Sequence, residues 1–144
     1  MKQWIRRALT HFAAAVLGVS ALTVVSASPA QAFGNETFGC RVSPGTVLTW
    51  RNPCTNNRPA ATYNAGFNLL NLSGDGYTFS WSISGDVLYI VAGCTSTSSG
   101  CGVATPGGSS DGFVHVTVTY SQGGQTASRS ATAIIRGYCG GQLC

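Results

Sequence analysis

The sequence predicts an all-β fold, a single small antiparallel β-sandwich with disulfide-braced loops. After Phe33, apolar residues recur with a period of two, between short turns rich in Gly, Asp and Ser. The chain also carries six cysteines, all beyond residue 32. An even number of cysteines in a small secreted chain is typical of disulfides that support a modest core.

The first 32 residues predict a secretory signal. A basic start precedes an uncharged, mostly apolar run over residues 12–25, and Ala30-Gln31-Ala32 fits the small-x-small cleavage pattern. We therefore expect a secreted, extracellular protein whose single domain is 33–144. Cleavage lowers the formal net charge from +4 to +1. Without a basic stripe or a second apolar run, nucleic-acid binding and membrane insertion are not expected.

Strand signals are uneven before residue 77. Residues 33–40 form a possible N-terminal arm, either an edge strand or a loose segment. Thr46–Trp50 and Ala60–Leu72 are further strand candidates, the second less regular.

The second half of the chain alternates more cleanly. Tyr77–Ile83 places its aromatic residues and Ile83 on one face, and Ser and Thr on the other. Val87–Val91 is apolar on both faces and predicts a hairpin partner near the core. Phe113–Tyr120 alternates again, with Val114, Val116, Val118 and Tyr120 inward. A tight turn then leads into the Ser/Thr/Ala-rich strand 125–136, which makes six or seven strands in all.

Residues 93–112 form the longest stretch predicted to be irregular. A Cys94–Cys101 disulfide would brace half of it, and Cys139 and Cys144 are also close in sequence. Cys40 and Cys54 then remain as the third pair. Six cysteines allow fifteen connectivities, so this set is a hypothesis based on short loop closure.

The run from Tyr77-Thr-Phe-Ser-Trp-Ser-Ile-Ser-Gly85 through 113–120 to 125–135 resembles the immunoglobulin-like and PKD-like domains of bacterial secreted proteins. In those domains a Y-x-W-x-I/V-x-G strand precedes a V-x-V-T-V/A strand and a last hairpin. The resemblance covers residues 77–136 and implies an immunoglobulin-like sandwich with a binding or spacing role. The braced loops are also similar in style to secreted actinobacterial chromoprotein apoproteins.

Catalytic groups are few. His115 is the only conventional base after residue 32, and its strand position points it outward, four residues from Asp111. Paired carboxylates would have to come from Glu36, near the predicted mature N-terminus, and three aspartates in turns. The cysteine spacings do not match those of zinc sites. We expect no catalysis, no metal and no cofactor.

The sequence therefore predicts a secreted, non-catalytic protein–protein interaction module, an adaptor or structural subunit of an extracellular assembly such as a bacterial secreted toxin complex. The N-terminal arm would add as a strand to the open sheet edge of a protein partner. The predicted partner-binding residues are Phe33, Phe38, Trp50 and Phe113.

Three alternatives remain open. A carrier for a small antibiotic or chromophore would need an apolar cleft, which the 93–112 segment could wall. A protease inhibitor would present a braced loop such as 95–100. A carbohydrate-binding module would stack sugars on exposed aromatic rings. Trp50 is the better candidate for such a ring, because Trp81 shares its face with core residues.

Overall fold

The structure is a computed structural model that describes residues 33–144, so the predicted signal segment 1–32 lies outside it. The described residues form ten strands and no helix. In chain order the strands are β1 (Thr37–Ser43), β2 (Cys54–Thr55), β3 (Thr62–Leu70), β4 (Thr78–Gly85), β5 (Tyr89–Gly93), β6 (Gly100–Pro106), β7 (Gly112–Gln122), β8 (Gln125–Ile135), β9 (Tyr138–Cys139) and β10 (Gln142–Leu143).

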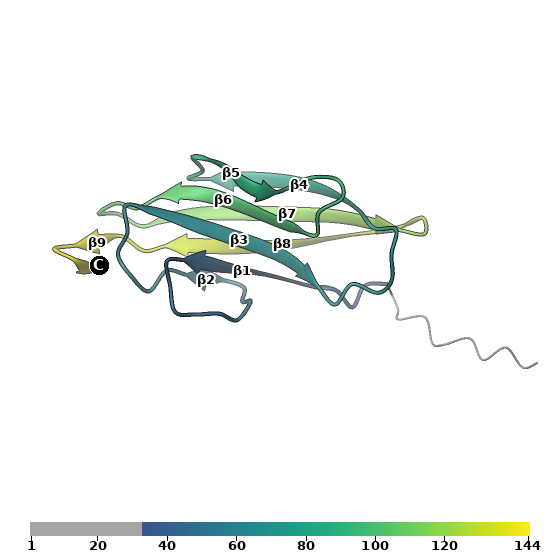
Figure 1. Cartoon of the computed structure of the whole chain (residues 1–144), viewed down its shortest axis with the longest axis horizontal. Coiled ribbons are helices and arrows are strands. Elements are labelled where there is room, and N and C mark those ends of the chain that lie inside the picture. Colours follow the sequence, from purple (N-terminus) through teal and green to yellow (C-terminus); the bar gives the residue numbers. More distant parts are fainter. Residues whose placement is uncertain (1–32) are drawn as a thin grey trace, which may run out of the picture.

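Two four-stranded sheets pack face to face (Figure 1). The first sheet has the order β1-β3-β6-β5 and is antiparallel throughout. The second has the order β2-β8-β7-β4 and is antiparallel except for the short β2, which runs parallel to β8. The predicted all-β sandwich is thus confirmed, with a small β9–β10 hairpin at its C-terminal end.

Alternation along the strands builds one core between the sheets, because successive side chains point to opposite faces. From the second sheet, Val114, Val116, Val118 and Tyr120 are fully buried, as predicted. From the first, β3 contributes Tyr63, Ala65, Phe67 and Leu69. Phe79 of β4 joins this core, and Trp81 and Ile83 pack against it as partly buried residues.

The prediction for Val87–Val91 was wrong. Residues after β4 cross to the other sheet, where β5 pairs with β6, while β4 pairs with β7. All five residues of β5 are exposed. An apolar run on both faces predicts burial, but β5 is the last strand of its sheet, with no neighbour on one side.

Two further segments differ from the predictions. Residues 93–112 are not an irregular loop throughout, because β6 lies within them and pairs with both β3 and β5. Its glycines hide the strand signal, since Gly is depleted in strands. Residues 46–50 form no strand. Only the next residue, Arg51, makes an isolated bridge to Cys40.

The three proposed disulfides are confirmed. Cys40–Cys54 joins β1 of the first sheet to β2 of the second. Cys94–Cys101 closes the turn between β5 and β6, and Cys139–Cys144 closes the β9–β10 hairpin. Three disulfides indicate that the domain folds in an oxidising environment.

Candidate interaction surface

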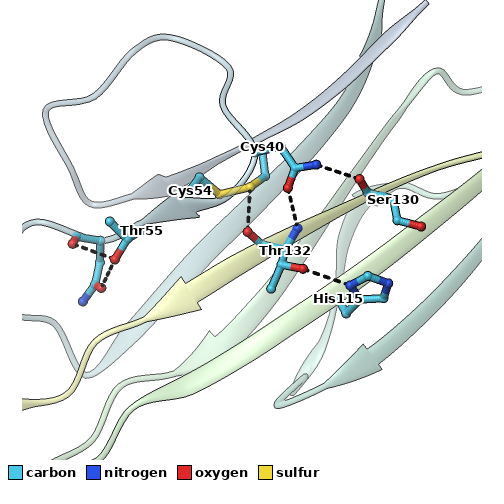
Figure 2. Close-up of a disulfide and its surroundings, with 8 residues drawn as sticks. Cys40, Cys54, Thr55, His115, Ser130 and Thr132 are labelled. Carbon is cyan, nitrogen blue, oxygen red and sulfur yellow. Dashed lines mark hydrogen bonds between the residues drawn. A yellow bond between two sulfur atoms is a disulfide. The ribbon is translucent and has the colours of Figure 1, made fainter.

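The residues considered for catalysis have separate structural partners. His115 Nδ1 lies 2.9 Å from Thr132 Oγ1 on the outer face of the second sheet, and the backbone carbonyl of the same Thr132 contacts Cys40 Sγ of the Cys40–Cys54 disulfide (Figure 2). Asp111 instead accepts a hydrogen bond from the Gly137 N–H, at 2.8 Å. Neither contact joins His115 to an aspartate, so this pair does not have the geometry of a hydrolytic triad.

Glu36 is placed more rigidly than its position in the sequence suggests. Its side chain is 3% exposed. Tyr77 Oη donates to Oε1 at 2.7 Å, while the Gly34 N–H and Tyr120 Oη donate to Oε2 at 2.7 and 3.0 Å. Arg129 donates to the backbone carbonyls of Gly34 and Glu36. These bonds fasten the start of the domain to the second sheet.

The same bonds shift two pKa values. Burial raises the pKa of Glu36, but hydrogen bonds from Tyr77, the backbone and Tyr120 lower it by more, so the pKa lies below its ordinary value. Burial and the hydrogen bond to Glu36 raise the pKa of Tyr120 to about 12. The carboxylate is therefore held ionised and the phenol neutral.

The predicted N-terminal arm is not free to reach a partner. Thr37–Ser43 is paired along its length with β3, and Phe38 is buried in the core at 8% exposure. Phe33 packs its ring on Tyr77 and Tyr120, with centroids 6.4 and 5.4 Å away. Phe38 therefore does not lie on the surface, and the ring of Phe33 already packs against two residues of the same domain.

The other two predicted residues lie on opposite outer faces. Phe113 is 53% exposed on the second sheet, where its cross-strand neighbour Ile134 is also exposed. Trp50 is half-buried beside the first sheet, with the Arg41 guanidinium 3.9 Å from its ring centroid. The structure does not bring these two aromatic residues together.

One long side of the sandwich is closed by the segment 51–57. Arg51 exchanges backbone hydrogen bonds with Cys40 of β1. The Asn52 side-chain amide donates to the Ser130 carbonyl and accepts from the Thr132 N–H, both on β8. The Asn56 side-chain amide donates to the carbonyl of Arg136 and accepts from its N–H, just after β8 ends. The edges of β1 and β8 are thus covered by the chain itself.

The opposite side is covered only in part. Phe79 of β4 donates its N–H to the Ser96 carbonyl, and the Trp81 indole donates to the Thr95 carbonyl. No backbone group within residues 33–144 pairs with the edge of β5 that faces away from β6. An open strand edge of this kind is a template for another chain.

The side chains on and beside this edge are apolar. Leu88, Tyr89, Ile90 and Val91 are between 48% and 60% exposed. Residues 87–110 contain no charged side chain. Natural edges are usually protected by Lys, Pro or a bulge, and β5 has only a register shift between Ile90 and Ala92. We call Leu88–Gly93 the open edge.

A second feature lies on the outer face of the first sheet. Two adjoining hollows of about 350 and 300 Å³ share Trp50 and Gly66 in their walls. Arg41 and Asn64 line the first, and Asn68, with several glycines, lines the second.

The sequence predicted neither the open edge nor the hollows, although Trp50, which lines both hollows, was among the predicted binding residues. The apolar run at Val87–Val91 was recognised, but its edge position depends on which sheet the chain enters after β4, and no local pattern encodes that choice. The hollows did leave a signal, because Gly66, Gly100 and Gly102 lie inside strands. Glycine within a strand often marks a site where a ligand approaches the backbone closely.

Comparison of the chain with protein-family models, with curated proteins and with solved structures finds no match. Residues 33–144 contain no group of three or more His, Cys, Asp or Glu side chains arranged to hold a metal ion. The same residues contain no helix long and apolar enough to cross a membrane. The proposals below therefore depend on the geometry and chemistry of this chain alone.

Proposed function

We propose that this protein is a secreted, non-catalytic interaction module that acts as an adaptor in an extracellular assembly. The open edge carries the proposal: a strand that is paired on one edge only and bears large exposed apolar side chains. It replaces the N-terminal arm as the predicted contact. The module here receives a strand from its partner, whereas the arm was expected to donate one.

The chemistry of the open edge defines the partner segment. Backbone groups of β5 would pair with an extended chain, and its alternating side chains would select residues of matching shape. Because residues 87–110 carry no charge, the complementary segment is neutral and apolar. A charged strand would lose hydration there without gaining an ion pair.

A partner of different sequence fits better than a second copy of this chain. A five-residue strand is about 17 Å long, so pairing two such strands buries only a few hundred Å², below the roughly 1,000 Å² of a specific interface. A two-fold copy would present the same short strand. A separate partner is able to continue beyond β5 onto the neighbouring surface.

The test measures the native size of the protein by gel filtration, both purified alone and from culture supernatant with its companions identified. We expect a monomer when it is alone and a larger complex of defined composition in the supernatant. In that complex, the amides of β5 that do not bond to β6 should become protected from hydrogen exchange, because a partner strand would bond to them.

Two variants locate the contact. Ile90→Lys places a charge on the open edge and should return the protein to monomer size without unfolding it, since this side chain is 56% exposed. Leu48→Lys is the matched control, because Leu48 is 77% exposed in the β1–β2 loop. Secretion as a monomer, dimerisation of the protein on its own, or a complex that survives Ile90→Lys would each overturn the proposal.

A further inference from the structure

We infer that the outer face of the first sheet is a binding site for a neutral oligosaccharide, with Trp50 as its aromatic platform. This site is separate from the open edge and goes beyond the proposed adaptor role. The glycan site is defined by Trp50, Asn64, Gly66, Asn68 and Gly102, which line the two adjoining hollows.

Glycines form the floor of the glycan site. The strand registers place Arg41, Gly66, Gly102 and Ala92 in one row across the outer face of the sheet. A Cβ added at Gly66 would meet nothing within 4 Å, and one at Gly102 only atoms 3.7 Å away or more. The space that side chains would fill is therefore empty, and a flat ring is able to approach the strand backbone.

Trp50 forms a fixed wall of this site. Its Cβ lies above Gly39 of β1, where even an added Cβ would come within 3.0 Å, so residue 39 has to be a glycine for the indole to sit there. The Arg41 guanidinium lies over the Trp50 ring and donates to the Leu48 carbonyl at 2.9 Å. Only the first hollow is lined by Arg41, whereas the second is lined by uncharged residues, among them Trp50, Asn68 and several glycines.

Polar groups free to bind a ligand surround this floor. Within residues 33–144, the side-chain amides of Asn64 and Asn68 and the indole N–H of Trp50 have no hydrogen-bond partner. Asn68 shares a row with Gly39 and Gly100, and Asn64 lies on the same strand, two residues from Gly66 on its other side. An amide both donates and accepts, as a pair of adjacent sugar hydroxyls requires.

This combination favours a neutral sugar over other ligands. A pyranose ring has a face of C–H groups that stacks on an aromatic ring, and a rim of hydroxyls that bonds to amides. Arg41, the one charged lining residue, lines only the first hollow and is held against Trp50 and Leu48, and the second hollow has no charged side chain that would select an ion. Each hollow is at the lower end of the about 300–1,000 Å³ typical of ligand sites, so a chain of several sugars would occupy both.

The experiment follows Trp50 fluorescence in a Trp81→Phe variant, which leaves one tryptophan in residues 33–144. The probes are hexamers of β-1,4-linked glucose, β-1,4-linked N-acetylglucosamine and α-1,4-linked glucose. We expect at least one to change the emission saturably, at concentrations below about 1 mM. Isothermal titration calorimetry on the protein with Trp81 intact checks that the substitution does not create the signal.

Gly66→Val tests the location without threatening the fold. Valine favours strands, and the space at Gly66 is open, so the variant should melt no lower than the parent while losing at least about tenfold in affinity. Gly108→Val is the matched control, because Gly108 also has open space but lies outside both hollows. The inference is wrong if no hexamer binds, or if Gly66→Val binds as well as the parent does.

Discussion

Replacing Glu36 by Gln removes the charge that fastens the N-terminal segment to the core. The carboxylate accepts three hydrogen bonds, from Tyr77, Tyr120 and Gly34. Glutamine keeps one acceptor oxygen and turns the other into an NH₂ group. With its NH₂ group at the Oε2 position, glutamine would set a donor against the Gly34 N–H; with that group at the Oε1 position, the Tyr77 hydroxyl could no longer donate to the side chain.

The cost follows from those bonds. A hydrogen bond to a charged group contributes about 1.5–3 kcal/mol, and the remaining contacts lose their charge assistance, so we expect a loss of about 2–4 kcal/mol. For a domain of this size, that corresponds to a fall in Tm of about 10 °C. The residue is almost fully buried, so solvent does not replace the lost contacts.

The effect should depend on pH. The pKa of Glu36 in the folded state lies below its ordinary value, so its contribution is fully present above the unfolded pKa of about 4.3 and is lost as pH falls through the folded pKa. Thermal melts of the wild type and Glu36→Gln should therefore differ most near pH 7, and should converge as the pH falls below about 4.

Asp75→Asn provides the control for this measurement. Asp75 is exposed and only its backbone carbonyl takes part in a hydrogen bond. We expect its Tm to stay within a degree or two of the wild type at every pH, as for most surface substitutions. Equal melting of Glu36→Gln and wild type at pH 7, or a difference that does not shrink in acid, would refute the role assigned to Glu36.

Three further predictions concern stability. Thr105→Val should raise the free energy of unfolding by about 1 kcal/mol in denaturant melts, because the buried Thr105 hydroxyl has no partner in residues 33–144. Tyr120 should ionise near pH 12 in an ultraviolet titration, above the ordinary tyrosine pKa of about 10. Its stabilisation is present below pH ~10, the ordinary tyrosine pKa, and is lost as pH rises through the folded value. Replacing Cys94 and Cys101 together by Ser should cost about 2.5 kcal/mol by loop entropy and speed hydrogen exchange at Phe79, whose N–H bonds to the braced loop. An unchanged free energy of unfolding for Thr105→Val, a Tyr120 that ionises near pH 10, or an unchanged exchange rate at Phe79 would contradict the respective expectation.

The sequence predicts the parts of this fold that depend on local alternation. In β7, every second side chain from Val114 to Tyr120 is apolar or aromatic, and the prediction that these side chains face the core is confirmed. The disulfides were also predictable, since each joins cysteines no more than 14 residues apart. Loop closure over such distances has a low entropic cost.

Sheet membership was not predictable in this way. The chain changes sheets between β4 and β5, where the Asp86 N–H bonds to the Phe113 carbonyl and the Leu88 N–H to that of Ala104. Those partners are 16 or more residues away, and no period in the sequence specifies them. Glu36 was also misjudged, because its two tyrosine partners lie 41 and 84 residues further along the chain.

The closure of one side by residues 51–57 has a consequence for stoichiometry. Growth of a filament requires each subunit to offer two surfaces, one to receive a neighbour and one to be received. Here β1 and β8 are already occupied by Arg51, Asn52 and Asn56, while β5 remains available. Strand pairing at β5 therefore joins this molecule to one partner, and an adaptor built like this has to reach its second component through a surface other than the β1–β8 side, such as the glycan site on the outer face of the first sheet.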